Sequence, residues 1–173
     1  MYFSTTYPSP VGLITLASDG DNLAGLWLAG QKYHGHSIPG AMTEKDDLPI
    51  LNQTKHWLNR YFSGEKPAIS QLQLAPIGSA FRQSVWDILC EIPYGKMITY
   101  GDIARKLGVQ SSQAVGGAVG HNPISIIIPC HRVVGANGSL TGYAGGVQTK
   151  IKLLELECVD MSKLFVPKKG TAL

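Results

Sequence analysis

Residues 122–134 read NPISIIIPCHRVV, and four of the five residues before Pro129 are isoleucine. A short run rich in β-branched residues and bounded by prolines predicts a buried, extended segment. Pro129 cannot donate a backbone hydrogen bond to a sheet, so the extended segment is expected to end there. The polar residues that follow, Cys130, His131 and Arg132, are therefore expected where the chain leaves the core.

Cys130 and His131 are the first candidates for chemistry. A free cysteine beside a weak base can form a nucleophile, because the thiolate reacts and the thiol does not. Adjacent side chains on a regular strand point to opposite faces, so His131 can assist Cys130 only if the chain turns there or a water joins them. From these two residues alone, an inert buried cysteine is the more frequent alternative.

Composition sets broad limits on the function. The chain is 44% hydrophobic and 16% charged, which is typical of a globular protein with one core or two small subdomains. Its net charge of +3 permits nucleic-acid binding but provides no dense basic stripe. No apolar run has the length of a membrane span, and the first residues do not resemble a signal peptide.

The cysteine and histidine positions favour a reducing compartment and no metal. Three scattered cysteines are too few for a disulfide framework, so we expect a cytoplasmic protein, associated with the nucleoid if bacterial. The histidines of the N-terminal half have no thiol or carboxylate partner at metal-ligand spacing. We therefore expect no metal ion and a solvated loop around His34 and His36.

The first 78 residues have the pattern of a small sheet with one helix. Residues 11–17 and 23–28 flank an Asp-Gly turn signal and predict an antiparallel hairpin. Residues 30–45 are predicted to form a loop because they are interrupted by glycine and proline. A helix is expected to follow the aspartates at 46 and 47 and to end at Gly64, with a buried face made by Leu51, Leu58, Tyr61 and Phe62.

Residues 65–79 mark the expected boundary between two domains, 1–78 and 79–173. The second domain begins with a predicted helix over 81–91 and closes with one over 147–157. The expected fold class is α+β: an N-terminal antiparallel sheet with a helix, then a mostly helical part that contains the active-site cysteine.

Two short helices are predicted between these. Thr99 and Asp102 form a capping-box pattern for a helix that stops at Gly108, and Ser111 or Ser112 caps a helix over 113–120. Together they predict a helix-turn-helix. The second helix is mostly Ala, Gly and Val. Such a composition indicates either close packing on a neighbouring element or, given its place just before Cys130, docking on DNA.

The segment Pro129-Cys130-His131-Arg132-Val133 closely resembles the signature of the methylated-DNA–protein-cysteine methyltransferases, the O6-alkylguanine-DNA repair proteins. The resemblance extends over residues 81–157 and more faintly over the N-terminal half. It implies a ribonuclease-H-like domain at 1–78 and a DNA-binding, alkyl-acceptor domain at 79–173. It also implies a monomer without cofactor that repairs O6-alkylguanine, and O4-alkylthymine, in double-stranded DNA.

The resemblance assigns four catalytic residues. Cys130 would accept the alkyl group as a thioether, which has no good leaving group, so each molecule would repair one lesion. His131 would act through a water as the base that activates the thiol, and Glu157 would orient His131. Asn122 would tie the docking helix to the active-site segment. Arg132 matches an arginine with a mainly structural role.

The resemblance also implies a pocket for a base flipped out of the duplex. Tyr100 would donate toward the base ring, and the carbonyl groups of Cys130 and Val133 would accept from the guanine amino group. Tyr143 and Ala144 would form the wall, with the Ala144 N–H near O6. The residues expected to face DNA are Tyr100, Ser112, Gln113, Ala114, Gly116 and Gly117.

Gln113 departs from the family pattern, because relatives usually carry an arginine there to fill the gap left by the flipped base. Glutamine can form hydrogen bonds but lacks the charge and the planar stacking surface of arginine. We therefore expect weaker DNA binding and slower flipping, with little change in cysteine chemistry on a free base.

Three other functions fit part of the pattern. A non-enzymatic lesion-binding relative usually carries tryptophan in place of the acceptor, and Cys130 argues against that. A multi-turnover cysteine hydrolase usually draws its Cys and His from distant parts of the chain and would not explain the helix-turn-helix. A role in transcription is the weakest alternative, because the relatives that have one are fused to regulatory domains.

Overall fold

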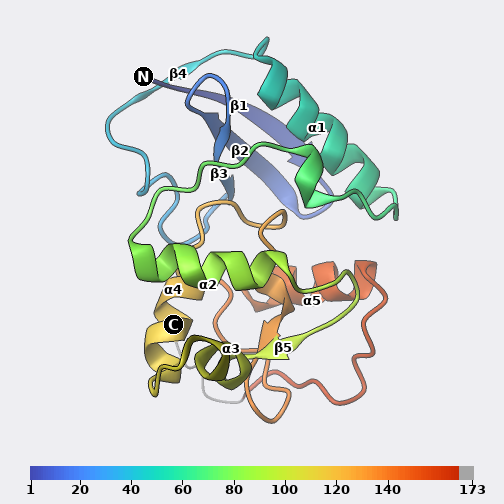
Figure 1. Ribbon diagram of the computed structural model, residues 1–173. Helices are drawn as coiled ribbons and strands as arrows, with labels where there is room; N and C mark the ends of the chain where they lie inside the picture. Colours follow the sequence, from blue (N-terminus) through green and yellow to red (C-terminus); the bar gives the residue numbers. More distant parts are fainter. Residues whose placement is uncertain (168–173) are drawn as a thin grey trace. The chain divides into compact units, whose positions relative to one another are not determined.

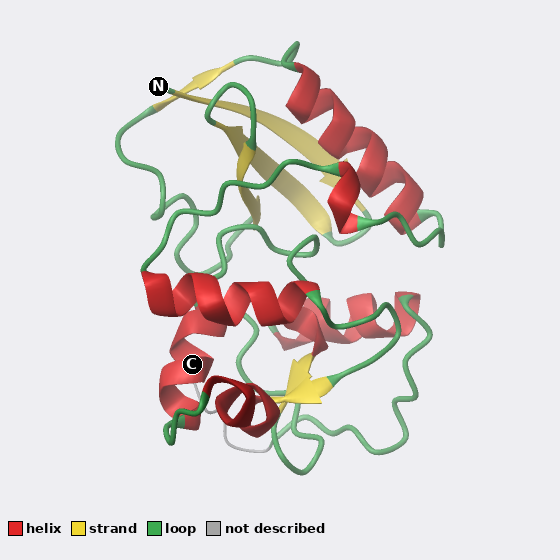
Figure 2. Cartoon of the chain, viewed as in Figure 1, coloured by secondary structure: helices red, strands yellow, loops and turns green. Residues whose placement is uncertain are grey.

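The computed structural model describes residues 1–167 and divides into two compact units. Unit 1 consists of Met1–Gly78 together with Pro123–Ser125, and unit 2 consists of Ser79–Asn122 and the chain from Ile126 onward. The four-stranded sheet belongs to unit 1, whereas most of the helices belong to unit 2 (Figure 2). The α+β class predicted from the sequence is confirmed.

The sheet of unit 1 has the strand order β3-β2-β1-β4. Its strands are β1 (Tyr2–Ser9), β2 (Gly12–Ser18), β3 (Leu23–Leu28) and β4 (Met42–Glu44). The predicted hairpin is confirmed as the antiparallel pair β2–β3, in which Ile14 lies opposite Leu28. The short strand β4 pairs parallel with β1 inside a segment that was predicted to be a loop. Three residues are too few to show the alternation that identifies a strand.

Helix α1 (Pro49–Phe62) packs on this sheet (Figure 1). Its buried residues include Leu51, Leu58 and Tyr61, as the helical spacing predicts. The helix follows Asp46 and Asp47 as expected, but Leu48 occupies the cap position without a side-chain bond, and Asp46 accepts a hydrogen bond from Thr5. A 3₁₀ turn, η1 (Ile69–Gln71), follows α1 in the chain.

The outer edge of β3 is paired with residues 123–125. The Leu26 N–H donates to the Pro123 carbonyl at 2.8 Å, and the Ser125 N–H donates to the Leu26 carbonyl at 3.0 Å. The Ser125 hydroxyl also donates to the Gln31 side-chain oxygen at 3.1 Å. Three residues of the isoleucine-rich stretch are thus held by the sheet of unit 1.

Unit 2 contains helices α2 (Ala80–Cys90), α3 (Tyr100–Leu107), α4 (Ser112–Gly120) and α5 (Val147–Leu156) (Figure 1). Each lies within one residue of its predicted bounds. The capping box of Thr99 and Asp102 is confirmed, and Gly108 ends α3 with a φ of 66°. Ser111, rather than Ser112, caps α4 by accepting from the Ala114 N–H.

Two short strands of unit 2 had no sequence signal. Strands β5 (Ile98–Thr99) and β6 (Val133–Val134) form a parallel pair that joins the start of α3 to the end of the active-site stretch. Between them in the chain, the 3₁₀ turn η2 spans Cys130–Arg132. The Trp86 indole N–H donates to the Ala118 carbonyl at 2.9 Å and so ties α2 to α4.

Candidate active site

The stretch at 122–134 is buried throughout, as predicted, but it is not extended throughout. Before Pro129, Ile124 forms a sheet-like bridge with Leu26, and residues 125–128 turn back. The Asn122 side-chain N–H donates to the Ile128 carbonyl at 2.8 Å, which closes the loop. Ile126 lies at the turn with a φ of 71°, a rare conformation for a β-branched residue. The run of β-branched residues predicted an extended segment. The turn could not be predicted from that run, because the run does not show that the Asn122 side chain bonds to Ile128.

The chain also turns at the cysteine. Pro129 has φ −82° and ψ 64°, and the Cys130 N–H donates to the Ile128 carbonyl at 2.8 Å, as in an inverse γ-turn. Cys130 to Arg132 then form η2. The turn that His131 requires in order to assist Cys130 is therefore present.

The Cys130 side chain is held away from solvent, with 4% of the residue exposed. Burial raises the pKa of Cys130, while a hydrogen bond from Asn122 and the charge of Lys150 act to lower it. The net direction is upward, so the resting group is a thiol. A base is needed to convert it into the reactive thiolate.

His131 and Glu157 form the next part of the site. The His131 Nε2 atom lies 2.5 Å from Glu157 Oε2, and both side chains are fully buried. Burial alone would raise the pKa of Glu157, but the bonds and charges of His131 and Arg132 hold it well below its usual range. The carboxylate is therefore the acceptor and Nε2 the donor. This leaves Nδ1, which is buried and has no hydrogen-bond partner among the described residues, as the unprotonated nitrogen.

His131 is neutral at physiological pH. Burial lowers its pKa, assisted by the charges of Arg132 and Lys150, and this outweighs the opposing effect of Glu157. A neutral imidazole with a free Nδ1 lone pair can accept a proton. The geometry therefore contains a thiol, a base and an acid that orients the base, drawn from η2 and the end of α5.

Lys150 was missed in the sequence. Its side chain is fully buried on α5, and its Nζ atom donates to the Val133 carbonyl at 2.5 Å and to the Thr141 carbonyl at 3.0 Å. Burial lowers the pKa of Lys150 to about 8, although a Cys130 thiolate acts to raise it. The available signal was its position on the same face as Leu153 and Leu154, where a lysine is unusual.

The residues predicted to line a base pocket lie in unit 2. Tyr100, at the start of α3, is nearly buried, and its hydroxyl donates to the Thr141 carbonyl at 3.1 Å. Burial raises the pKa of Tyr100, and the charge of a Cys130 thiolate adds to this, so the hydroxyl stays protonated. Val133 and Tyr143 are buried and Ala144 is half-buried.

Helix α4 has one exposed and one buried side. Ser112, Gln113 and Ala114 are exposed, and a Cβ atom at Gly117 would meet no atom of the described residues within 4 Å beyond the nearby backbone of α4 itself. Gly116 is different: it lies on the buried side among Val115, Ala118 and Val119. Four of the five α4 residues predicted to face DNA therefore share an accessible surface, and Gly116 does not.

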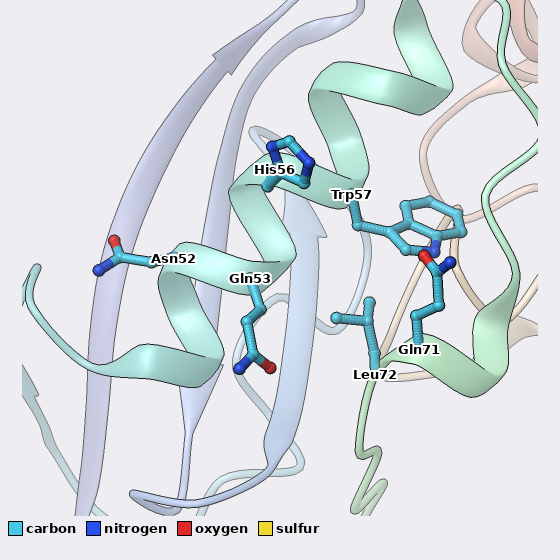
Figure 3. Close-up of a pocket in the computed structure, with 6 residues that line it drawn as sticks. All are labelled: Asn52, Gln53, His56, Trp57, Gln71 and Leu72. Atoms are coloured by element: carbon cyan, nitrogen blue, oxygen red, sulfur yellow. The ribbon is translucent and has the colours of Figure 1, made fainter.

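A cavity of about 380 Å³ lies on unit 1, and none of the predicted site residues lines it. Figure 3 shows its walls, which come from α1 and from the segment at η1: Asn52, Gln53, His56, Trp57, Gln71 and Leu72. Within residues 1–167, no three His, Cys, Asp or Glu side chains are grouped to hold a metal ion. In the same part of the chain, no helix has the length and apolar character to cross a membrane.

Two family models match the chain. The 6-O-methylguanine DNA methyltransferase ribonuclease-like domain matches residues 2–76, and the DNA-binding domain of the same family matches residues 80–159. The chain belongs to the 6-O-methylguanine DNA methyltransferase family. The resemblance seen in residues 129–133 is thereby confirmed.

Individual relatives agree with this assignment. A methylated-DNA–protein-cysteine methyltransferase of Haemophilus influenzae is 43% identical over 157 residues, which cover 90% of this chain and 86% of the relative. The crystal structure of Mycobacterium tuberculosis O6-methylguanine methyltransferase is 40% identical, with a TM-score of 0.79 over 98% of this chain and 97% of that one. Mycobacterium tuberculosis OGT in complex with DNA is 43% identical, with a TM-score of 0.79 over 91% and 92% of the two chains.

Proposed function

We propose that this protein repairs DNA by moving an alkyl group from O6 of alkylguanine in double-stranded DNA to Cys130, irreversibly and once per molecule. In this reaction the sulfur–carbon bond forms as the carbon–O6 bond breaks, and the thiol proton passes to His131. The electron pair of the broken bond stays on the departing guanine, an anion that needs a proton or a hydrogen-bond donor. O4-alkylthymine, which presents the same alkyl–oxygen bond, is proposed as a second substrate. The observation that carries the proposal is the buried set of Cys130, His131 and Glu157, held on one turn and one helix end.

The pKa directions support the roles of these residues. Because the pKa of Cys130 is raised, the thiol does not ionise unaided at neutral pH. His131 is neutral and its Nδ1 is the unprotonated nitrogen, so it can take the thiol proton through a water. Glu157 fixes the tautomer, and Asn122 holds the segment that presents the sulfur.

The base pocket is proposed to be lined by Tyr100, Cys130, Val133, Tyr143 and Ala144. Tyr100 is a competent donor toward the departing guanine because its hydroxyl remains protonated. That hydroxyl donates to the Thr141 carbonyl in the present structure. When a base enters, the Tyr100 hydroxyl must therefore leave Thr141 in order to donate to the base. Lys150 also donates to the Thr141 carbonyl and keeps it paired after Tyr100 leaves.

DNA docking is proposed through the exposed surface of α4, formed by Ser112, Gln113, Ala114 and Gly117. Small side chains there permit a close approach to the nucleic-acid backbone. Gln113 occupies the position of the residue that fills the gap left in the duplex by the flipped base. Gly116, on the buried side, contributes by allowing α4 to pack tightly. Because glutamine has no charge, we propose that flipping is slower than with arginine.

The domain bounds, the oligomeric state and the cellular location of the protein are also proposed. We propose domains at 1–78 and 79–173, a monomer, and a cytoplasmic location at the nucleoid. The location is supported by three cysteines that are all unpaired, as expected in a reducing compartment. Size-exclusion chromatography with light scattering, on the protein alone and with duplex DNA, tests the monomer.

The mechanism is tested by intact mass after incubation with duplex DNA that contains O6-methylguanine, beside a Cys130→Ser control. We expect one methyl group per molecule on Cys130 and none in the control, with no further transfer from added substrate. Transfer only from free O6-benzylguanine would contradict the DNA-docking proposal. No transfer from either substrate would contradict the alkyl-transfer proposal itself.

A further inference from the structure

Arg132 follows His131 in the chain, and its guanidinium is almost fully buried. Its Nε donates to Glu157 Oε1 at 2.7 Å, and its Nη1 donates to the Ile92 carbonyl at 2.7 Å. The guanidinium carbon lies 5.7 Å from the centre of the Tyr94 ring. Three different groups therefore hold this cation at one place and orientation.

The carboxylate of Glu157 is divided between its neighbours. Oε2 accepts from His131 Nε2 at 2.5 Å, whereas Oε1 accepts from Arg132 and from the Gly95 N–H at 3.2 Å. His131 and Arg132 thus do not compete for one oxygen atom. Taken together, the positive guanidinium, the negative carboxylate and the neutral imidazole have no net charge.

We propose that Arg132 is a positioning residue for the alkyl transfer: it keeps Glu157 anionic, so that His131 holds its proton on Nε2 and keeps Nδ1 free to accept the proton of Cys130. This inference rests on the proposed function. It assigns Arg132 a role beyond packing, because the arginine acts on the state of the base and not on the substrate.

Charge balance gives the direction of the effect. Without Arg132, His131 and Glu157 would carry a buried negative charge, and binding one proton would restore neutrality. Within residues 1–167, the other ionisable groups that act on the pair are Lys150, which acts on His131, and Tyr94, which lies near Glu157, and neither replaces the lost cation next to Glu157. A pair that has taken up this proton cannot accept another from Cys130, so removal of Arg132 moves the protonation of the base to higher pH.

The test compares the wild type with Arg132→Gln and Arg132→Lys over pH 5–9. One readout is the ¹⁵N chemical shift of the His131 ring nitrogens, which reports its tautomer and charge directly. The other is the rate of transfer from free O6-benzylguanine to Cys130, which does not depend on DNA docking. Arg60→Gln is the matched control, because Arg60 pairs with Glu65 on the exposed surface of unit 1.

In the wild type we expect a neutral His131 with its proton on Nε2 down to the acid end of the range. In Arg132→Gln, proton uptake by the pair and the acid limb of the rate should both move upward by about one pH unit or more, which is a tenfold loss on that limb. The rate should recover toward the wild type at high pH. Arg132→Lys should lie between the two, since lysine keeps the charge without the planar fork.

A uniform loss of rate at every pH, with unchanged His131 shifts, would overturn the proposal and leave Arg132 a packing role. If Arg132→Gln does not fold, the Arg132→Lys profile decides alone, and no displacement there overturns the proposal. The imidazole shifts are independent of catalysis, so they still test Arg132 if the wild type transfers no alkyl group and the proposed function fails.

Discussion

The side-chain amide of Asn122 donates to the main-chain carbonyl of Ile128 at 2.8 Å, and this single bond closes the loop that leads to Cys130. The same carbonyl accepts from the Cys130 N–H. The position of the cysteine is therefore fixed from both sides by one acceptor, which is why a residue outside the signature segment matters for its chemistry.

Asn122→Ala should destabilise the protein and slow alkyl transfer. The mutation removes one of the two donors to the Ile128 carbonyl, at a cost of about 0.5–1.5 kcal/mol, and removes a bond that lowers the pKa of Cys130. Urea unfolding measures the first effect, and transfer from free O6-benzylguanine measures the second. Asn52→Ala, at an exposed position on α1, is the control. Equal transfer rates in the two variants would contradict the positioning role of Asn122.

Gln113→Arg should accelerate repair of duplex DNA without changing the reaction with the free base. Arginine adds the charge and the stacking surface that glutamine lacks at the start of α4. Single-turnover rates on O6-methylguanine duplex and on O6-benzylguanine give the comparison. Gln110→Arg adds the same charge at an exposed position before α4. If both variants accelerate repair equally, the added positive charge is the cause, and the proposal that position 113 acts in base flipping is contradicted.

Lys150→Met should change how stability depends on pH. The pKa of Lys150 is lowered to about 8 in the folded protein, whereas an unfolded lysine titrates near its ordinary value. Between these values the unfolded chain binds more protons, so the wild type should gain stability as pH rises through this window. We expect a gain of about 3 kcal/mol relative to Lys150→Met, measured by urea unfolding from pH 7 to 10.5. Lys152→Met, which removes an exposed lysine of the same helix, should show no such trend.

Trp86→Phe should weaken the attachment of α4 to α2. The indole N–H donates to the Ala118 carbonyl, and phenylalanine keeps one aromatic ring but removes the donor and the five-membered ring of a fully buried side chain. The unpaired carbonyl costs about 1–3 kcal/mol and the smaller side chain leaves a cavity that adds to this, so thermal unfolding should show a fall in melting temperature. Ser84→Ala, which removes an exposed bond within α2, is the control. An unchanged melting temperature would show that the bond contributes no net stability.

The sequence predicted the helices of unit 2 well because their signals are local. Thr99 and Asp102 cap α3 within four residues, and Gly108 ends it by adopting a positive φ. Helical periodicity likewise identified α1, α2 and α5, since each buries one face. Such features depend on neighbours in the chain and can be recognised without a structure.

The errors concern contacts between distant residues. The segment at 125–128 turns back, and the Asn122 side chain donates a hydrogen bond to the Ile128 carbonyl across this turn. The spacing of apolar residues in the sequence gives no sign of that bond. Lys150 is buried because two carbonyl groups, from Val133 and Thr141, face its ammonium group. Strands β4, β5 and β6 are two or three residues long and exist only through their partners. Family resemblance named Glu157 for His131, a pairing across 26 residues that the residues alone did not predict.

The placement of Pro123–Ser125 in unit 1 means that the backbone passes between the units three times: after Gly78, after Asn122 and after Ser125. The bond between Ser125 and Gln31 joins positions 94 residues apart in the sequence. Such a chain is not modular. A chimera of two relatives joined at residue 78 would inherit β3 from one parent and its edge segment from the other, only five residues ahead of the reactive sulfur. Whether such a hybrid folds would depend less on the choice of junction than on whether β3 of one parent can pair with residues 123–125 of the other.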